Sequence, residues 1–532
     1  MNLYRWRNSF VSYAQSFWHG HQTAVILTGF MIIGLAVRLW GVGFGLPNLE
    51  HPDEDAVLMP AITIIKTGNL EPVRMEYGTL HIYLLTAVST VVYLYAARNG
   101  IFTSPEQLTV FERGSYPAIY PHPEFFVGAR LLSVILSTLL ILVVYLLADR
   151  LGNRRQALVA AGLTAVLPDL VKHAHFATTD IALTFFSTIS LYLLLRAYDN
   201  WDTDSMWAFV GASFVSGLTA STKLNGIVLI IPILLVIFLK VKRLDSLLSL
   251  RVLSAPIGMF FGFLVGTPYA LLNLPKFLYW SGYAFRLYNA PSVELSQPSW
   301  LWHLSYHVTS PNIILVFLGF IGFFFSIRIW RERGLIISSF AVFLWIAIVT
   351  QTTHQARMWL PTAPIFVLWG VLVIDFLQQQ LKARLANYKL SPNFSMILPL
   401  SLFLILLNNS IVISKIFYEP DVRTITQNWI EQNIPAGSKL AIEYFAPNLN
   451  PDKWTTTRLF HLADQPLEWF QTEGVDYLIA SEAGNDPTQM TVEAYDKRIA
   501  LLEKACLIQQ FEGPFLSAES RRFWVYQVPP CN

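Results

Sequence analysis

Apolar and polar stretches alternate along most of the chain. Runs of about 16 to 22 mainly apolar residues recur, close to the roughly 20 residues that a helix needs to cross a hydrocarbon core. This pattern predicts an all-α polytopic membrane protein. The runs lie near residues 20–41, 79–97, 128–148, 157–172, 181–198, 206–222, 225–240, 253–272, 312–328, 335–350, 360–378 and 395–414.

The positive charges between these runs indicate how the chain is oriented, because Lys and Arg are retained in cytoplasmic loops. If 79–97 also crossed the membrane, the Arg-rich loop after 128–148 would lie outside. We therefore expect 79–97 to be an interfacial or re-entrant helix, which leaves about eleven spans, a cytoplasmic N-terminus and an outside C-terminus. The cationic loops are Arg150–Arg155, Lys240–Arg243 with Arg251, Arg328–Arg333 and Lys382–Lys389.

This topology divides the chain into a transmembrane domain, 1–414, and a soluble extracytoplasmic domain, 415–532. Its outer segments are about 42–127, 273–311 and 415–532. In the soluble part we expect a small α/β domain with a helix over Asp421–Gln432 and strands over Lys439–Tyr444, Asp476–Ala480 and Phe523–Val528. Cys506 and Cys531 also lie there and could form a disulfide.

The composition agrees with a membrane protein. Hydrophobic residues make up 54% of the chain and charged residues 14%, whereas soluble domains carry about 25% charged residues. The net charge of +2 gives no indication of nucleic-acid binding. We expect an integral multi-pass membrane protein.

The first outer segment opens with a crowded acidic sequence, Leu49-Glu50-His51-Pro52-Asp53-Glu54-Asp55. Like-charge repulsion at the edge of the hydrocarbon can raise the pKa of a carboxylate toward that of a useful base. Asp53 and Glu54 are therefore candidate catalytic residues. The alternative is a solvated turn in which these carboxylates favour the start of a helix.

A second acidic position lies at the same face of the membrane. His173-Ala-His175-Phe-Ala-Thr-Thr-Asp180 ends one apolar run and begins the next. Asp180 is a candidate catalytic residue, or it caps the following helix while His173 and His175 are interface residues.

Two cations oppose the positive-inside pattern. Arg357 precedes a helix interrupted by Pro361, and Lys223 separates two short apolar runs. A cation near bilayer depth costs about 2.5–3.5 kcal/mol unless it is paired, so a lipid phosphate is a suitable partner; snorkelling or a protein carboxylate is the alternative. Further substrate-binding candidates are Arg74, His81, Arg130, His173, His175 and His354.

In these features the chain resembles the GT-C-type glycosyltransferases, specifically the superfamily of protein O-mannosyltransferases and aminoarabinose-lipid A transferases. The resemblance implies a catalytic Asp in an acidic first outer loop, interfacial helices within that loop and a second outer-loop Asp. The sequence departs from the lipid A transferases at Met75–Gly78, where they carry a Lys. The residues that carry the resemblance are His51–Glu54, Gly128–Arg130, His173–Asp180 and Arg357–Pro364.

The predicted function is transfer of a hexosyl or pentosyl group from a polyprenyl-phosphate donor to a hydroxyl of a glycolipid, glycan or protein at the outer face. Asp53 would be the base of an inverting displacement, and cations would hold the phosphate. Asp53-x-Asp55 is too short a pattern to assign a metal, and we expect no cofactor. The alternatives are a transporter or flippase of lipid-linked sugars, with ionisable residues near mid-membrane, and a scaffold without a deep cavity.

Overall fold

The fold was analysed in a computed structural model. It describes residues 3–49, 51, 53–112, 120–203, 206–243, 245, 248–289, 298–352, 354–443, 446–482, 492–513 and 522–531. Pro52 of the acidic motif and Tyr444 of a predicted strand lie outside these residues.

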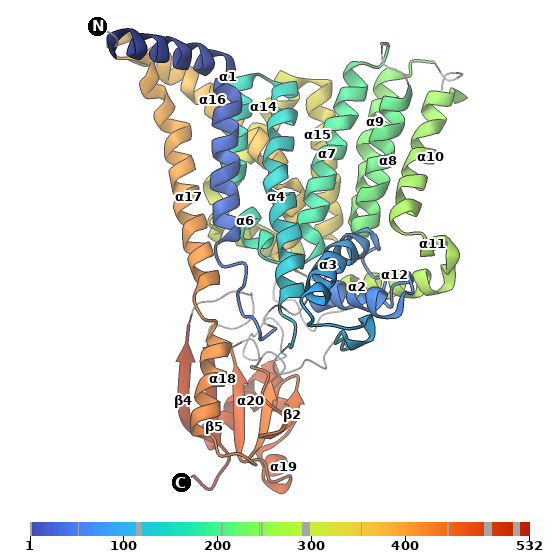
Figure 1. Cartoon of the computed structure of the whole chain (residues 1–532), viewed down its shortest axis with the longest axis vertical. Coiled ribbons are helices and arrows are strands. Elements are labelled where there is room, and N and C mark those ends of the chain that lie inside the picture. Colours follow the sequence, from blue (N-terminus) through green and yellow to red (C-terminus); the bar gives the residue numbers. More distant parts are fainter. Residues whose placement is uncertain are drawn as a thin grey trace.

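A bundle of long helices forms the larger part of the protein (Figure 1). Among the described residues, eight helices are long and apolar enough to cross a membrane, and a ninth span would combine α5 and α6, which meet at 52°. These candidates include Leu80–Arg98, which the eleven predicted spans exclude. Eight of the eleven are therefore among the candidates, and the remaining three, α8, α9 and α10, are shorter helices. The bundle helices are α1 (Leu3–Leu39), α4 (Glu124–Leu151), α5 (Arg154–Ala165), α6 (Pro168–Ala174), α7 (Thr179–Asp199), α8 (Met206–Thr222), α9 (Ile230–Lys240), α10 (Leu250–Gly266), α14 (Ile313–Trp330), α15 (Glu332–Val349), α16 (Ala363–Asn387) and α17 (Ile397–Tyr418).

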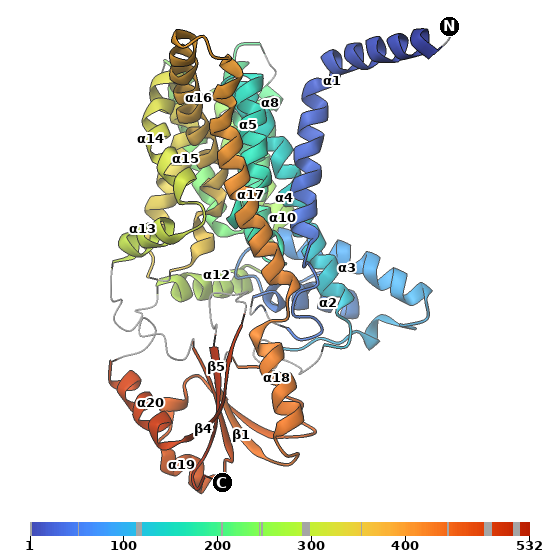
Figure 2. The same ribbon diagram turned by 90° about the vertical axis from the view of Figure 1, so that its left-hand side faces the viewer.

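Several helices lie across one end of this bundle instead of along it (Figures 1 and 2). The apolar run predicted to be interfacial forms one of them, α3. Although α3 is one of the eight helices that could cross a membrane by length and composition, its direction places it against the end of the bundle, beside α2. The crosswise helices are α2 (Asp55–Thr67), α3 (Leu80–Arg98), α12 (Leu274–Asn289) and α13 (Ser299–Thr309).

The helices differ in how much of their surface the protein covers. In the segment from the 3-10 helix η4 (Ala356–Thr362) through α16, 83% of the residues in the most apolar stretch are buried by the rest of the protein. In α1 the corresponding share is 17%. Small residues let some helices approach closely: a Cβ at Gly217 on α8 or at Gly262 on α10 would collide with the backbone of the facing helix. The centre of the bundle is thus a packed protein core, while α1 forms part of its edge.

Polar contacts link the bundle helices at the end away from the crosswise helices. Asp199, at the end of α7, pairs with Arg150 at 3.2 Å and Arg333 at 2.8 Å. Arg155 donates to Gln378 at 2.8 Å. These cations come from the loops that the positive-inside pattern assigns to the cytoplasm.

The C-terminal part forms the predicted small α/β domain. Helix α18 (Val422–Asn433) leads into a five-stranded mixed sheet of order β2-β1-β3-β5-β4. The predicted helix and three strands are present within one or two residues as α18, β1 (Lys439–Glu443), β3 (Tyr477–Ser481) and β5 (Arg522–Gln527). The two edge strands, β2 (Thr455–Leu459) and β4 (Cys506–Glu512), were not predicted, because their few buried side chains give little apolar pattern. Helices α19 (Leu467–Thr472) and α20 (Val492–Lys504) accompany the sheet.

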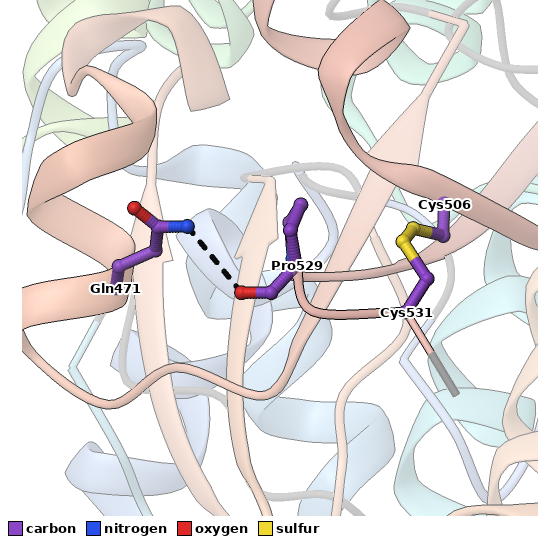
Figure 3. The surroundings of a disulfide bond; sticks show 4 residues. All are labelled: Gln471, Cys506, Pro529 and Cys531. Atoms are coloured by element: carbon purple, nitrogen blue, oxygen red, sulfur yellow. Dashed lines mark hydrogen bonds between the residues drawn. A yellow bond between two sulfur atoms is a disulfide. The ribbon is translucent and has the colours of Figure 1, made fainter.

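A disulfide fixes the C-terminus to the edge of this sheet (Figure 3). Cys506 opens β4 and is bonded to Cys531, 25 residues later. Nearby, Gln471 donates a hydrogen bond to the Pro529 carbonyl at 3.3 Å. Disulfides persist in oxidising compartments, so this bond agrees with an extracytoplasmic C-terminal domain.

The crosswise direction of α3 generates a test of the topology. We expect a cysteine introduced by Val110→Cys, after α3, to react from the outer side with a membrane-impermeant thiol reagent in a chain whose Cys506 and Cys531 are replaced by Ser. A cysteine introduced by Arg154→Cys should react only from the cytoplasmic side. Cytoplasmic labelling at position 110 would contradict the assignment of α3 as an interfacial helix.

Candidate functional site

Four charged side chains from distant parts of the sequence meet at the end of the bundle that carries the crosswise helices. Asp53 precedes α2, Asp180 lies in the first turn of α7, and Lys223 stands between α8 and the 3-10 helix η2 (Leu224–Leu229). Arg357 comes from η4. Breaks in the helices position the two cations. Lys223 has extended backbone angles and separates α8 from η2. Gln355, the residue before η4, is also extended, and η4 continues directly into α16.

These four groups form a chain of alternating charge. Arg357 Nη2 donates to Asp53 Oδ2 at 2.5 Å, and Arg357 Nε lies 3.8 Å from Asp180 Oδ2. Lys223 Nζ donates to Asp180 Oδ1 at 2.9 Å. Isolated buried ions cost several kcal/mol each, so the balance of two anions and two cations is what permits this cluster inside the protein.

The cluster lines a small cavity together with Val57, Tyr77, Thr178 and Thr179. Its volume is about 10 Å³, roughly the space that one water molecule needs. Tyr77 lies beneath Lys223, whose Nζ is 5.6 Å from the ring centre, and burial raises the pKa of this phenol. A phosphate group would therefore fit at this place only if Asp53 and Arg357 separated.

His51 supports the backbone that carries Asp53. The Asp53 backbone N–H donates to His51 Nδ1 at 3.2 Å, so this ring nitrogen is an acceptor. The ring packs on Phe176, with centres 4.2 Å apart. Burial lowers the pKa of His51 to about 4, so the imidazole is neutral at physiological pH.

Glu54 faces away from this cavity, although it follows Asp53 directly. It forms a bidentate ion pair with Arg130 of α4, with N to O distances of 2.8 and 2.7 Å. Arg130 also donates to the carbonyls of Val42 and Phe44, and Glu54 accepts from the Ala177 backbone N–H at 2.9 Å. Glu54 and Arg130 thus join the loop after α1 to α4 and to the α6–α7 turn.

The four predicted histidines do not line this cavity. His175 lies between two backbone carbonyls, with Nδ1 2.8 Å from the Val171 oxygen and Nε2 3.0 Å from the Trp40 oxygen. His81 Nε2 is 3.4 Å from the Ala177 carbonyl, and the His173 ring packs on Phe176. His354 stacks on Trp302, with ring centres 5.3 Å apart.

Arg74 lies at a second, larger cavity on another face of α2. Its guanidinium pairs with Glu76 at 2.7 Å and lies 4.9 Å from the ring centre of Trp280. Asp55 lines this second cavity and not the first. The Asp53-x-Asp55 spacing therefore does not bring both carboxylates to one cavity, and no group of three or more metal-ligating side chains occurs among the described residues.

Sequence reasoning missed Asp169 on α6. Its carboxylate accepts from Trp359 Nε1 at 2.9 Å and from the Tyr306 hydroxyl at 3.1 Å. Because Trp359 follows Arg357 on η4, this contact fixes the segment that carries the cation. A lone carboxylate inside the apolar run 157–172 was the signal that could have identified it.

The comparisons with known proteins agree with this architecture. Residues 124–270 match the family described as dolichyl-phosphate-mannose-protein mannosyltransferase. No curated protein sequence matches the chain significantly. Over residues 124–270 this match confirms the resemblance to the protein O-mannosyltransferases that the sequence predicted.

Two solved structures share the fold. The Archaeoglobus fulgidus oligosaccharyltransferase, tethered with an acceptor peptide, aligns over 96% of this chain and 74% of its own, at 14% identity and a TM-score of 0.56. ArnT from Cupriavidus metallidurans, bound to undecaprenyl phosphate, aligns over 94% of this chain and 98% of its own, at 14% identity and a TM-score of 0.51. The chain thus has the predicted GT-C-type membrane fold with a C-terminal α/β domain.

The Glu54–Arg130 pair generates a stability test. We expect Glu54→Gln to lower the free energy of unfolding by about 3–5 kcal/mol, because Arg130 would remain buried without its counter-ion. Thermal unfolding in detergent measures this loss. Glu419→Gln, which removes an exposed pair with Lys415, is the control and should cost at most about 1 kcal/mol. Equal losses in both variants would contradict a structural role for the buried pair.

Proposed function

We propose that this protein is a membrane glycosyltransferase that moves a sugar from a polyprenyl-phosphate donor to a hydroxyl acceptor at the outer face of the membrane. The observation that carries the proposal is the alternating charge cluster of Asp53, Arg357, Asp180 and Lys223, at the end of a GT-C-type bundle. Its residues lie at helix ends and in a loop, whereas a transporter site would be expected near the middle of the spans.

Arg357 and Lys223 are suited to hold the donor phosphate. The phosphate of a polyprenyl-phosphate sugar is a diester with one negative charge, and it can replace a carboxylate on a guanidinium through charge-assisted hydrogen bonds. Solved structures of proteins with this fold contain undecaprenyl phosphate and dolichol phosphate. In this proposal the phosphate takes the place of Asp53 on Arg357, and Asp180 keeps both cations in position.

Separation from Arg357 would turn Asp53 into a base. The acceptor oxygen attacks the anomeric carbon as Asp53 accepts the hydroxyl proton, and the bond from that carbon to the phosphate oxygen breaks. The electron pair leaves with the phosphate, whose second pKa near 6 means that no general acid is required. A single displacement of this kind inverts the anomeric configuration.

Charge and redox chemistry support the proposed membrane orientation. The cationic loops define a cytoplasmic end, and the disulfide of the C-terminal domain favours an oxidising compartment for the opposite end. The acceptor class would be a glycolipid, a glycan or a protein, and the membrane that of a bacterial cell.

A first prediction concerns the donor. Arg357→Gln should weaken binding of undecaprenyl phosphate by about tenfold to a hundredfold, because it removes the binding free energy of one or more charge-assisted hydrogen bonds. Arg357→Lys should lose less, because it keeps the charge but not the fork geometry.

Binding can be measured by titrating the purified protein in nanodiscs. The control is Arg243→Gln, an exposed cation paired with Asp245, which should leave affinity unchanged. Undiminished affinity in Arg357→Gln would remove Arg357 from the donor site.

A second prediction concerns the base. Asp53→Asn keeps the shape of the side chain and removes its proton affinity, so turnover should fall by about 10²–10⁴, the usual contribution of general acid–base catalysis. Transfer from a panel of radiolabelled polyprenyl-phosphate sugars measures it. Donor binding should persist, because the phosphate contacts cations.

The matched control is Asp452→Asn in an exposed turn of the soluble domain, which should retain turnover. Full turnover by Asp53→Asn would exclude Asp53 as the base.

A further inference from the structure

Three buried phenylalanines meet at the outer end of α17. Phe44 follows α1, Phe176 lies in the turn between α6 and α7, and Phe417 is in the last turn of α17. The ring centres are 5.6, 4.9 and 5.5 Å apart in the three possible pairs, and none of the three residues is more than 4% exposed. These residues are called the aromatic triad below. Because each ring packs on both others, the triad joins three segments that are far apart in the sequence.

One corner of the triad supports the chain just before Asp53. The Phe176 ring packs on the His51 ring, with centres 4.2 Å apart. His51 Nδ1 accepts the hydrogen bond from the Asp53 backbone N–H at 3.2 Å. Since close packing leaves the His51 ring little room to turn, Phe176 fixes the direction of this acceptor.

A second corner supports the residue that follows Asp53. Phe44 lies against the Arg130 guanidinium, whose central carbon is 3.8 Å from the ring centre. Arg130 donates to both carboxylate oxygens of Glu54, at 2.8 and 2.7 Å. The triad therefore reaches the chain on both sides of Asp53, and a shift of the triad would move the backbone that carries the proposed base.

The third corner belongs to the helix that carries the soluble domain. Phe417 also stacks on His175, with ring centres 4.2 Å apart and ring planes at 7°. The chain after α1 fits closely against Phe417, because a Cβ at Gly41 would lie 2.8 Å from its carbonyl carbon. Only residues 419–421 separate α17 from α18 (Figure 2). A displacement of the outer end of α17 would therefore reach the triad directly.

We infer that Phe417 is a positioning residue for Asp53, so that the helix carrying the soluble domain sets the position of the base through the aromatic triad. This role rests on the proposed function, in which Asp53 accepts the acceptor's proton. A base must lie within hydrogen-bond reach of that proton, and a misplacement of about 1 Å can cost about a hundredfold in rate.

The donor cations are carried by other segments. Arg357 lies on η4, and Lys223 lies between α8 and η2. Neither segment contributes a ring to the triad. Loss of a triad ring should therefore lower turnover without weakening donor binding, a combination that general destabilisation of the protein would not produce.

Phe417→Leu tests this role, because it removes the ring and keeps a buried apolar side chain. Turnover per donor-binding protein, measured with the polyprenyl-phosphate sugars, should fall by about tenfold to a hundredfold. Affinity for undecaprenyl phosphate in nanodiscs should be unchanged.

The matched control is Phe403→Leu, the same change about four turns earlier on α17. The Phe403 ring packs on Phe30 of α1, with centres 5.6 Å apart, and should affect neither quantity. Equal turnover losses in the two variants, or weaker donor binding by Phe417→Leu, would overturn the inference.

A double variant tests whether Phe417 acts through His51. His51→Asn keeps an acceptor for the Asp53 N–H, because Asn side chains bond the backbone two residues on, but it removes the ring that Phe176 contacts. In this background Phe417→Leu should lower turnover much less than in the native chain, since residues of one coupled network are not additive. A full, multiplicative loss in the double variant would exclude this route.

Hydrogen exchange gives a readout that needs no turnover. Peptides that contain Asp53 should exchange faster in Phe417→Leu than in the native chain, because the turn held by His51 would open more often. The same peptides in Phe403→Leu should exchange at the native rate. Native exchange rates at Asp53 in both variants would contradict the positioning role.

These readouts keep the two proposals apart. If Asp53→Asn loses turnover while Phe417→Leu behaves like Phe403→Leu, the proposed function stands and the positioning role fails. If Phe417→Leu speeds exchange at Asp53 but no polyprenyl-phosphate sugar is a substrate, α17 is coupled to the acidic loop and the proposed function fails.

Discussion

The ion pair between Asp53 and Arg357 is the interaction on which the site depends. In the alternating chain of charges it is the link most accessible to solvent, with side-chain exposures of 17% and 13%, compared with 4% and 7% for Asp180 and Lys223. It is therefore the link that an incoming anion can most readily break. While the link is intact, the cation is neutralised and the carboxylate is a poor base. A phosphate that binds Arg357 would change both conditions at once.

The surrounding structure fixes the position of this link from both sides. On the carboxylate side, Glu54 and Arg130 anchor the start of α2 to α4 and to the turn before α7. On the cation side, Asp169 holds Trp359 and with it η4. Both anchors are buried polar contacts, which are costly to break because removal of one partner leaves the other unsatisfied. The scaffold can thus remain rigid while the exposed ion pair opens.

Much of the architecture could be predicted because apolar runs and loop charge reflect the membrane directly. Each run corresponds to helical structure, and the crosswise direction of α3 followed from the need to keep Arg150–Arg155 on one side with the other cationic loops. The helices α8, α9 and α10 were also expected to be spans. They are 17, 11 and 17 residues long, at or below the short end of the roughly 17–25 residues that spanning helices use. Neighbouring helices, not composition, decide such cases.

The sequence identified the charged residues of the site but not which of them form ion pairs with one another. Asp53 and Asp180 were selected as carboxylates at the outer boundary, and Arg357 and Lys223 as cations that oppose the positive-inside pattern. The structure brings these four together. Sequence proximity suggested a common catalytic role for Asp53 and Glu54, but consecutive residues around a helix start, Asp53 to Asp55, point in different directions. One faces the cluster, one pairs with Arg130, and one lines the second cavity.

The proposed mechanism depends on exchange of Asp53 for the donor phosphate on Arg357. An electron cryo-microscopy structure of the protein in nanodiscs with undecaprenyl phosphate tests this most directly. The account predicts a phosphate oxygen within hydrogen-bond distance of the Arg357 guanidinium, and the Asp53 carboxylate displaced from the 2.5 Å contact that it makes with Arg357 here. A bound phosphate elsewhere, with the Asp53–Arg357 pair intact, would contradict it.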